Sequence, residues 1–236
     1  MAEHVSGCIL CGAPLAYVTK AEPRICALCG ATGDADAACK AGHYVCDRCH
    51  QLGAPELIEQ VCVRAAGTDP LRLAVELMRS PRIHMHGPEH HFLVPAVLLA
   101  AFLNASGRGA EKEKLIGEAR RRAQAVKGGF CGFWGACGAA IGVGIFASLV
   151  QDASPLSKAE WRVANAATAR ALARIAERGG PRCCKRDTFL ALSSAADSAR
   201  ESLGVLLALP ATIHCEFSAM NEECLNDECP FFAPSL

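Results

Sequence analysis

The sequence lacks a net charge and has few aromatic residues. Its 24 Lys and Arg residues equal its 24 Asp and Glu residues, so the formal net charge is zero. Proteins that bind DNA or RNA usually carry a basic surface, so this balance argues against a nucleic-acid partner. Aromatic residues make up only 6% of the chain, whereas hydrophobic residues make up 51%. This composition predicts a core in which helices pack closely through small residues.

Long apolar runs are also missing. The apolar runs at 92–103 and 139–150 are about a dozen residues each, whereas a helix needs about 20 residues to cross a bilayer. Residues 1–8 show no basic stretch followed by an apolar one, which is the pattern of a secretory signal. We therefore expect a cytoplasmic protein with no membrane partner.

Cysteine, in contrast, is abundant, with 15 residues in the chain. Thiols stay reduced in the cytosol, so a disulfide framework is not expected. Many free thiols tolerate oxidants badly, which suggests an anaerobic cell. Residues with metal-ligand chemistry form four closely spaced pairs near the N-terminus: Cys8 and Cys11, Cys26 and Cys29, Cys39 and His43, Cys46 and Cys49. Seven further cysteines are spread over apolar, helical-looking sequence: Cys131, Cys137, Cys183, Cys184, Cys215, Cys224 and Cys229.

The two groups of cysteines coincide with a change in sequence pattern. Residues 1–52 are rich in Gly, Cys and turn formers, which predicts a small zinc-ribbon-like or treble-clef-like metal module with short strands. Residues 53–236 have helical periodicity and predict an all-α domain, so the expected fold class is mainly α. The expected helices span 55–66, 69–79, 92–103, 110–126, 138–151, 157–178 and 187–208.

The N-terminal pairs have the spacing of zinc ligands. The first two Cys-x-x-Cys pairs are fourteen residues apart and are each followed by Gly, a pattern that fits one tetrahedral four-cysteine site. The second set is Cys39, His43, Cys46 and Cys49. This order allows two sequential sites or an interleaved cross-brace, and spacing alone does not decide between them. We expect one or two zinc ions here, although an iron site of the rubredoxin kind has similar spacing.

A histidine-rich loop precedes the apolar segment that begins at Phe92. Between His84 and His91 it holds four histidines and one glutamate, interrupted by Gly-Pro. An imidazole beside a carboxylate supplies a general acid or base near neutral pH. The alternative is a helix N-terminus with polar capping residues. The residues for which we expect catalytic roles are His86, Glu89 and His90.

Two further segments carry thiols beside small or cationic residues. Cys131 and Cys137 flank a Gly-rich stretch that enters a helix of small residues, whose free amides suit an anion or cluster sulfide. Close helix packing would explain the glycines of that helix but not the cysteines. The segment 181–187 places two adjacent thiols beside two cationic side chains, which favour the thiolate form and could hold a substrate carboxylate.

These two segments suggest an iron–sulfur site. The expected ligands of an iron–sulfur cluster are Cys131, Cys137, Cys183 and Cys184. Lys185 and Arg186 are the expected anion-binding catalytic residues. The three thiols near the end of the chain match no common cluster spacing, so the sequence gives them no role.

The same segments resemble the iron–sulfur L-serine dehydratases. Cys137 with its small-residue helix is similar to their first cluster-ligand segment, and 181–187 is similar to their later Pro-Cys-x-x-Arg-Asn segment. The resemblance implies three cysteines that hold a [4Fe-4S] cluster whose open iron polarises the substrate hydroxyl. The related cysteine desulfidases use this arrangement to expel sulfide. The family's middle ligand segment, Thr-Cys-Asp-Pro, has no counterpart here, and Cys131, Cys184 or a C-terminal cysteine would replace it.

As a whole, the chain resembles an uncharacterised family of anaerobic bacteria and archaea, sometimes appended to methyltransferase or radical-SAM proteins. Two hypotheses for the function follow. The first is a non-redox [4Fe-4S]-dependent lyase or sulfur-handling enzyme, such as a desulfidase, that acts on a small carboxylated substrate. The alternative is a metal-binding accessory module, or a carrier of sulfur or metal, that serves a partner methyltransferase or radical-SAM enzyme.

Overall fold

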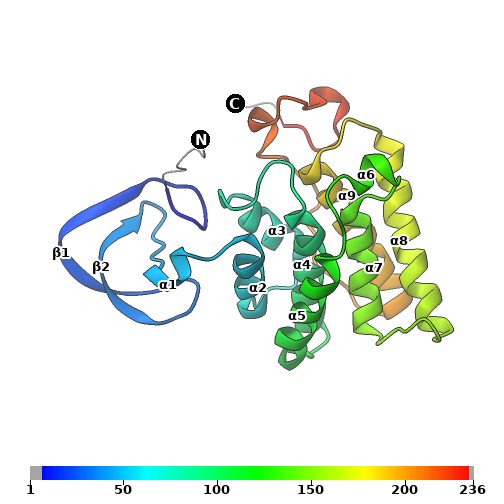
Figure 1. The fold of residues 1–236 in the computed structure, drawn as a ribbon, viewed down its shortest axis with the longest axis horizontal. Coiled ribbons are helices and arrows are strands. Elements are labelled where there is room, and N and C mark those ends of the chain that lie inside the picture. The colour runs from blue at the N-terminus through cyan, green and yellow to red at the C-terminus, as the bar shows by residue number, and fades with distance from the viewer. Residues whose placement is uncertain (1–6, 234–236) are drawn as a thin grey trace.

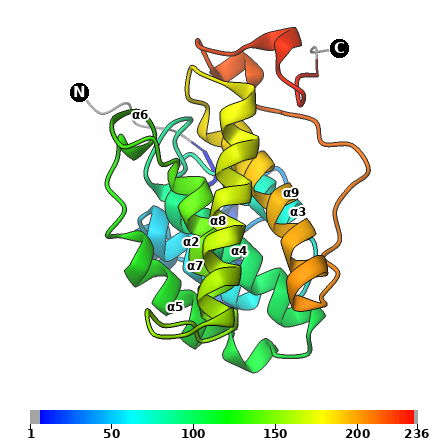
Figure 2. The same cartoon turned by 90° about the vertical axis from the view of Figure 1, so that its right-hand side faces the viewer.

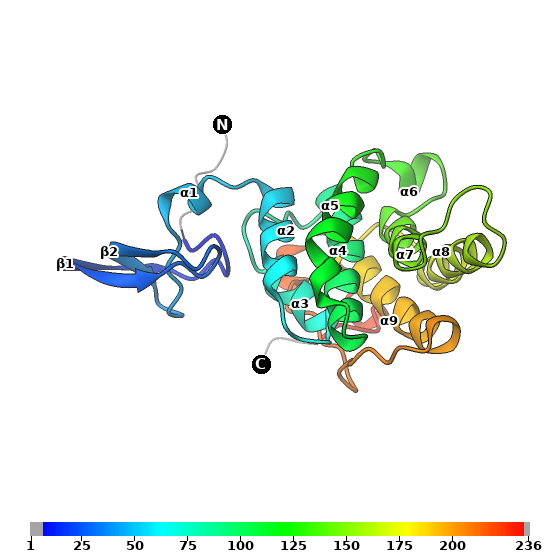
Figure 3. The ribbon, with the colours of Figure 1, turned by 90° about the horizontal axis from the view of Figure 1, so that it is seen from below.

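The computed structural model describes residues 7–233. About 52% of the chain is helical, with nine α-helices and one two-stranded sheet among the described residues. The fold is therefore mainly α, as the sequence predicts. The sheet and the first short helix lie together on one side of the helical domain (Figures 1 and 3).

A hairpin forms the framework of the N-terminal module. Strands β1 (Leu15–Ile25) and β2 (Thr32–Cys39) are antiparallel, with an irregularity in β1 between Tyr17 and Glu22. The one-turn helix α1 (Asp47–His50) follows. Most of β1 is exposed, so this hairpin has little apolar surface to bury and cannot supply much hydrophobic stabilisation.

The helical domain is built around α4 (Glu89–Ala105). Every residue from Phe92 to Leu103 is buried, because α4 packs against α2, α3, α5, α7 and α9 on different sides. A helix surrounded in this way has to be apolar on all faces. The other helices are α2 (Ala54–Arg64), α3 (Pro70–Met78), α5 (Lys112–Ala123), α6 (Phe130–Phe133), α7 (Gly138–Val150), α8 (Ala159–Arg178) and α9 (Cys184–Leu203), with a 3-10 turn at Gly109–Glu111.

Glycines allow α7 to approach its neighbours closely. A Cβ at Gly142 would lie 2.8 Å from Pro95 Cδ of α4, and one at Gly138 would lie 2.0 Å from the His91 ring. A Cβ at Gly144 would lie 2.0 Å from the Thr168 hydroxyl of α8. The small-residue helix thus serves close packing, which is the alternative that the sequence left open for these glycines.

The boundaries of α9 differ from the expected 187–208. The helix begins earlier, because Cys183 acts as its N-cap and its sulfur accepts a hydrogen bond from the Arg186 amide. It ends at Leu203, because Gly204 adopts a left-handed conformation with φ of 68° that favours glycine and terminates helices. The short helix α6 was not expected, since four residues give no periodic pattern.

Beyond α9 the chain has little regular structure. It runs back along the domain to the end where α9 begins (Figure 2) and forms two 3-10 turns, Ser218–Met220 and Asn226–Glu228. Phe217 and Phe231 are buried, and the Cys215 amide donates a hydrogen bond of 2.7 Å to the Phe231 carbonyl. Among the described residues no helix is long and apolar enough to span a membrane.

Candidate metal centres

Eight side chains of the N-terminal module form two groups with metal-ligand spacing. The first group is Cys8, Cys11, Cys39 and His43, and the second is Cys26, Cys29, Cys46 and Cys49. Within each group the ligand atoms lie within 4.8 Å of one another. Either group could hold a metal ion such as zinc.

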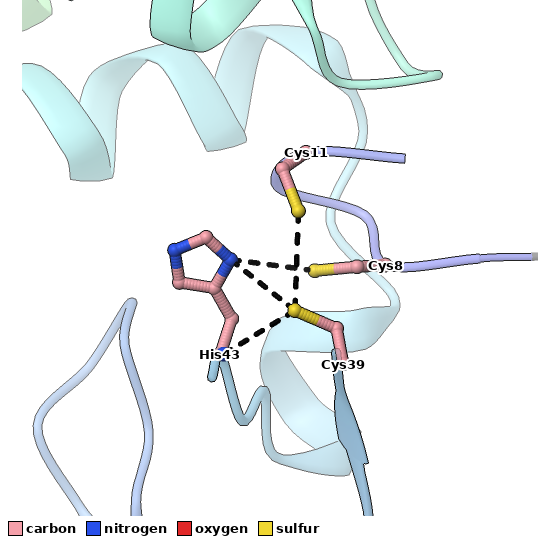
Figure 4. A group of neighbouring side chains, drawn as sticks. All are labelled: Cys8, Cys11, Cys39 and His43. Atoms are coloured by element: carbon pink, nitrogen blue, oxygen red, sulfur yellow. Dashed lines mark hydrogen bonds between the residues drawn. The ribbon is translucent and has the colours of Figure 1, made fainter. Parts of the chain in front are cut away.

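In the first group three sulfurs and one ring nitrogen point toward a common centre (Figure 4). The Cys11 and Cys39 sulfurs are 3.9 Å apart, and His43 Nδ1 lies 3.5 Å from the Cys39 sulfur and 3.9 Å from the Cys8 sulfur. A tetrahedral zinc ion with Zn–S bonds of about 2.3 Å separates its sulfurs by about 3.8 Å. The observed separations therefore suit one zinc ion.

The second group has the same geometry. The sulfurs of Cys29 and Cys46 are 3.7 Å apart, and the Cys46 amide donates to the Cys26 sulfur at 3.4 Å. Burial raises the pKa of Cys26, but backbone N–H groups directed at its sulfur outweigh burial and lower that pKa to about 6. Backbone donors that stabilise a thiolate are typical of metal-binding knuckles. Gly30 has a φ of 71° in this turn, which explains the glycine after the second Cys-x-x-Cys pair.

The two groups are interleaved. The first and third ligand pairs share one centre, and the second and fourth pairs share the other, so the arrangement is a cross-brace. The hairpin explains this order, because it places Leu15 opposite Cys39 and so brings the turn that contains Cys11 to the end of β2. The first two Cys-x-x-Cys pairs consequently do not share a four-cysteine site, which corrects the interpretation based on their fourteen-residue separation. His50 belongs to neither group.

The helical domain brings part of the predicted iron–sulfur site together. Cys137 precedes α7 and Cys183 precedes α9, and the Cys137 sulfur lies 3.8 Å from Asp187 Oδ2. Cys131 lies on α6 and is half-buried. Among the described residues the four expected cluster ligands do not form a group with ligand spacing within 4.8 Å. Their role as cluster ligands stays a prediction.

The histidine loop makes contact with the C-terminal segment. His86 Nε2 lies 3.1 Å from Asn221 Oδ1 and 3.5 Å from Glu223 Oε2. The Glu89 carboxylate accepts a hydrogen bond from the His84 amide and lies 2.7 Å from His84 Nδ1. The two predicted catalytic residues His86 and Glu89 therefore have separate partners.

His90 is buried, with 1% of its surface exposed. Its Nδ1 lies 3.2 Å from the Gly87 carbonyl, and its Nε2 has no partner among the described residues. Burial lowers the pKa of His90 to about 3, with a smaller contribution from the charge of Lys185. The ring is therefore neutral at neutral pH.

The two predicted anion-binding residues are also buried. Lys185 Nζ lies 3.3 Å from the Ile83 carbonyl, 3.5 Å from the Met78 carbonyl and 5.0 Å from the centre of the Phe217 ring. Burial lowers the pKa of Lys185 to about 8. Arg186 Nε contacts Asp187, and its Nη2 donates to two carbonyls of the preceding loop. Through these contacts with backbone carbonyls, both side chains hold neighbouring loops against the start of α9.

Sequence reasoning missed the polar residues that link these segments. Asp187 contacts both Cys137 and Arg186, and Asn221 contacts both His86 and Cys183. Asp187 was visible only as part of the 181–187 segment, and no periodic or spacing signal marks Asn221. Their partners come from distant parts of the chain, so only the fold shows their role.

A comparison with known protein families matches residues 58–232 to DUF5714, a family of unknown function. The chain belongs to this family. The matched segment begins within α2, after both metal groups of the module, and covers the rest of the helical domain and the segment after α9 as far as residue 232. The expectation of an uncharacterised family is thus confirmed. No curated protein and no solved structure matches the chain, so the similarity to L-serine dehydratases and the link to methyltransferase or radical-SAM proteins gain no support.

Proposed function

We propose that this DUF5714 protein is a metal-binding accessory protein whose N-terminal cross-brace holds two structural zinc ions. The proposal rests on the observation that the protein supplies all four ligands of each group. Each group offers four protein ligands with the spacing of a zinc tetrahedron. Zinc sites with four protein ligands are structural, because catalytic zinc keeps one position open for water or substrate.

The composition of the module's interior supports a structural role for the metal. Among its described residues the buried side chains are four thiols and three apolar residues: Cys8, Cys26, Cys39, Cys49, Ile9, Leu28 and Ala35. Buried thiols without a metal contribute little to folding, whereas a structural zinc ion couples its binding energy directly to folding. The module therefore depends on its metal for its structure.

The surroundings of the helical cysteines favour an accessory role over a lyase. A lyase of the expected kind needs a cation free to bind a substrate carboxylate and a base that reaches the substrate. Lys185 and Arg186 instead contact backbone carbonyls and Asp187, and His90 is buried. In this proposal a partner enzyme supplies the active site. The first partners to test are enzymes of the methyltransferase or radical-SAM class, which the sequence suggests.

Metal analysis tests the zinc assignment. Purified protein is expected to contain two zinc ions per chain, and His43→Ala is expected to retain one or none. The matched control is His50→Ala, which removes a nearby histidine outside both groups and is expected to retain two. Equal zinc contents in the two variants, or iron in place of zinc, would overturn the proposal.

Assays for pyruvate separate the accessory function from the lyase. Lyase cleavage converts L-serine into pyruvate and ammonia, and converts L-cysteine and one water into pyruvate, ammonia and sulfide. Anaerobically purified protein is expected to release no pyruvate from either amino acid. Turnover that is lost in His90→Ala and retained in His84→Ala would restore the lyase hypothesis.

A further inference from the structure

Four cysteines outside the N-terminal module meet at one hollow of the helical domain. Cys183 stands before α9, and Cys215, Cys224 and Cys229 come from the segment that folds back over this end of the domain. They line a small hollow of about 20 Å³ that is otherwise surrounded mainly by aromatic and aliphatic side chains. None of the four forms a disulfide. Three of these thiols had no role predicted from the sequence, and the fourth, Cys183, is one of the predicted cluster ligands.

Backbone amides are directed at three of these four sulfurs. The Arg186 amide donates to the Cys183 sulfur, the Phe217 amide to the Cys215 sulfur and the Asn226 amide to the Cys224 sulfur, each at 3.4 Å. Asn221 Nδ2 adds a second contact to Cys183 at 3.7 Å. The zinc groups of this protein show the same feature, with amides of His43 and Cys46 on their sulfurs. Such donors orient thiolate ligands and tune the metal that they bind.

The sulfurs are too far apart for one zinc ion. No three of these four sulfurs lie within 4.8 Å of one another, unlike those of the N-terminal groups. A single tetrahedral ion requires separations of about 3.8 Å. A [4Fe-4S] cluster binds one thiolate at each of its four irons, so its four ligand sulfurs lie farther apart than the sulfurs around a single zinc ion.

Buried cationic side chains lie beside the hollow. Lys185 and Arg186 are 1% and 3% exposed. Asp187 pairs with Arg186, and the charge of Glu89, whose side chain is largely buried, favours the protonated form of Lys185. The Lys185 ammonium group stands over the ring of Phe217, which lines the hollow. A [4Fe-4S] cluster bound by four thiolates carries a net negative charge, which cations beside it favour.

The described part of the segment after α9, residues 204–233, has little regular structure. It contains two 3-10 turns, and buried aromatic side chains and a few hydrogen bonds hold it across the end of the bundle (Figure 2). Irregular segments of this kind are commonly held by a disulfide or a metal, and disulfides are absent from the described chain.

We propose that Cys183, Cys215, Cys224 and Cys229 bind a [4Fe-4S] cluster. All four irons then have a protein ligand, so no iron is open to a substrate, in contrast to the cluster expected from the dehydratase resemblance. Such a cluster suits a structural or electron-transfer role. The inference goes beyond the two zinc ions of the proposed function and is independent of them.

Anaerobic purification gives the first test. The protein is expected to be brown, to bleach with dithionite, and to contain four irons and four sulfides per chain in addition to two zinc ions. A colourless protein that takes up no cluster on reconstitution with iron and sulfide would overturn the proposal. A third zinc ion, or two irons with two sulfides, would likewise overturn the four-iron assignment.

Substitutions test the ligand set. Cys215→Ser and Cys229→Ser are expected to lose the iron and keep two zinc ions. Cys131→Ser and Cys184→Ser are the matched controls, because these half-buried cysteines lie outside the hollow, and they are expected to keep both metals. The reverse pattern would return the site to the ligands suggested by the dehydratase resemblance and overturn this one. Circular dichroism shows whether each variant retains its helices.

Asn221→Ala provides a measurement that does not remove a ligand. The variant keeps all four thiols but loses the side-chain N–H that faces Cys183. Fewer hydrogen bonds to cluster sulfur lower the reduction potential. A cluster with an unchanged potential in this variant would contradict ligation by Cys183.

Discussion

In the N-terminal module most buried side chains are thiols, whereas in the helical domain they are aliphatic and aromatic. Among its described residues, 7–52, the module buries four cysteines and three other apolar residues, Ile9, Leu28 and Ala35. The helical domain wraps five helices around α4, which has twelve consecutive buried residues. The difference shows that one chain uses two sources of stability, metal ligation where the core is too small and side-chain packing where it is large enough.

The comparison extends to the way in which ligands are brought together. In the module each centre is made from two short turns joined by one hairpin, so local spacing carries most of the information. In the helical domain the proposed cluster ligands come from the start of α9 and from a segment that returns after a twenty-residue helix. Ligands of this second kind have no fixed spacing.

Removal of zinc should reduce stability more than any other change, and it should destabilise the N-terminal module alone. Structural zinc contributes about 10–16 kcal/mol of apparent folding free energy in zinc-finger peptides, far more than this small core can replace. Cys26→Ser, or dialysis against a chelator, is expected to abolish hydrogen-exchange protection of the hairpin amides. Amides of α4 are expected to keep their protection, because that helix is held by packing. Loss of protection in both regions would show that the two depend on one source of stability after all.

The contrast between the two regions also explains which features could be predicted from the sequence and which could not. The mainly α fold followed from periodicity, and the metal groups followed from paired Cys residues. The interleaving of the groups did not, because it depends on the pairing of Leu15 with Cys39 across the hairpin. Burial of Lys185 and Arg186 was missed for a similar reason. Cationic side chains next to cysteines look exposed in a sequence, whereas the segment after α9 covers them in the fold.

Acid should weaken the helical domain through His90. The pKa of this ring is lowered to about 3 by burial, whereas that of an unfolded histidine is about 6.5. Below pH 6.5 the unfolded chain gains a proton that the folded chain excludes, so stability is constant above that pH and falls as the pH drops toward 3. At pH 5 the expected loss is about 2 kcal/mol.

Urea unfolding followed by helical circular dichroism measures this effect. The variant His90→Gln is expected to reduce the difference between pH 7 and pH 5 by about 2 kcal/mol. The control His84→Gln, which removes an exposed histidine, is expected to keep the parent's difference. A parent protein with the same stability at both pH values would place the His90 ring in contact with solvent.

Overpacking between α4 and α7 should lower the free energy of unfolding by an amount similar to, or smaller than, the loss expected from His90 in acid. Gly138→Ala would place a methyl group 2.0 Å from the His91 ring, and relief of such a clash typically costs about 1–3 kcal/mol. Gly132→Ala is the matched control, because a Cβ there meets no atom within 4 Å, and it should be neutral or slightly stabilising. If both variants unfold at the same urea concentration as the parent, close packing at this contact is not what stabilises the domain.

An ion pair between α8 and α9 should contribute least to stability. Arg174 Nη2 lies 2.7 Å from Asp197 Oδ2, and both side chains remain about one third exposed. Exposed pairs contribute about 0.2–1 kcal/mol, because water screens the charges and ordering two side chains costs entropy. Arg174→Gln is therefore expected to lower the urea midpoint only slightly, and less so in high salt. A loss larger than that of Gly138→Ala would mean that charge, rather than apolar packing, holds α8 against α9, and the division between the two halves of the chain would need to be redrawn.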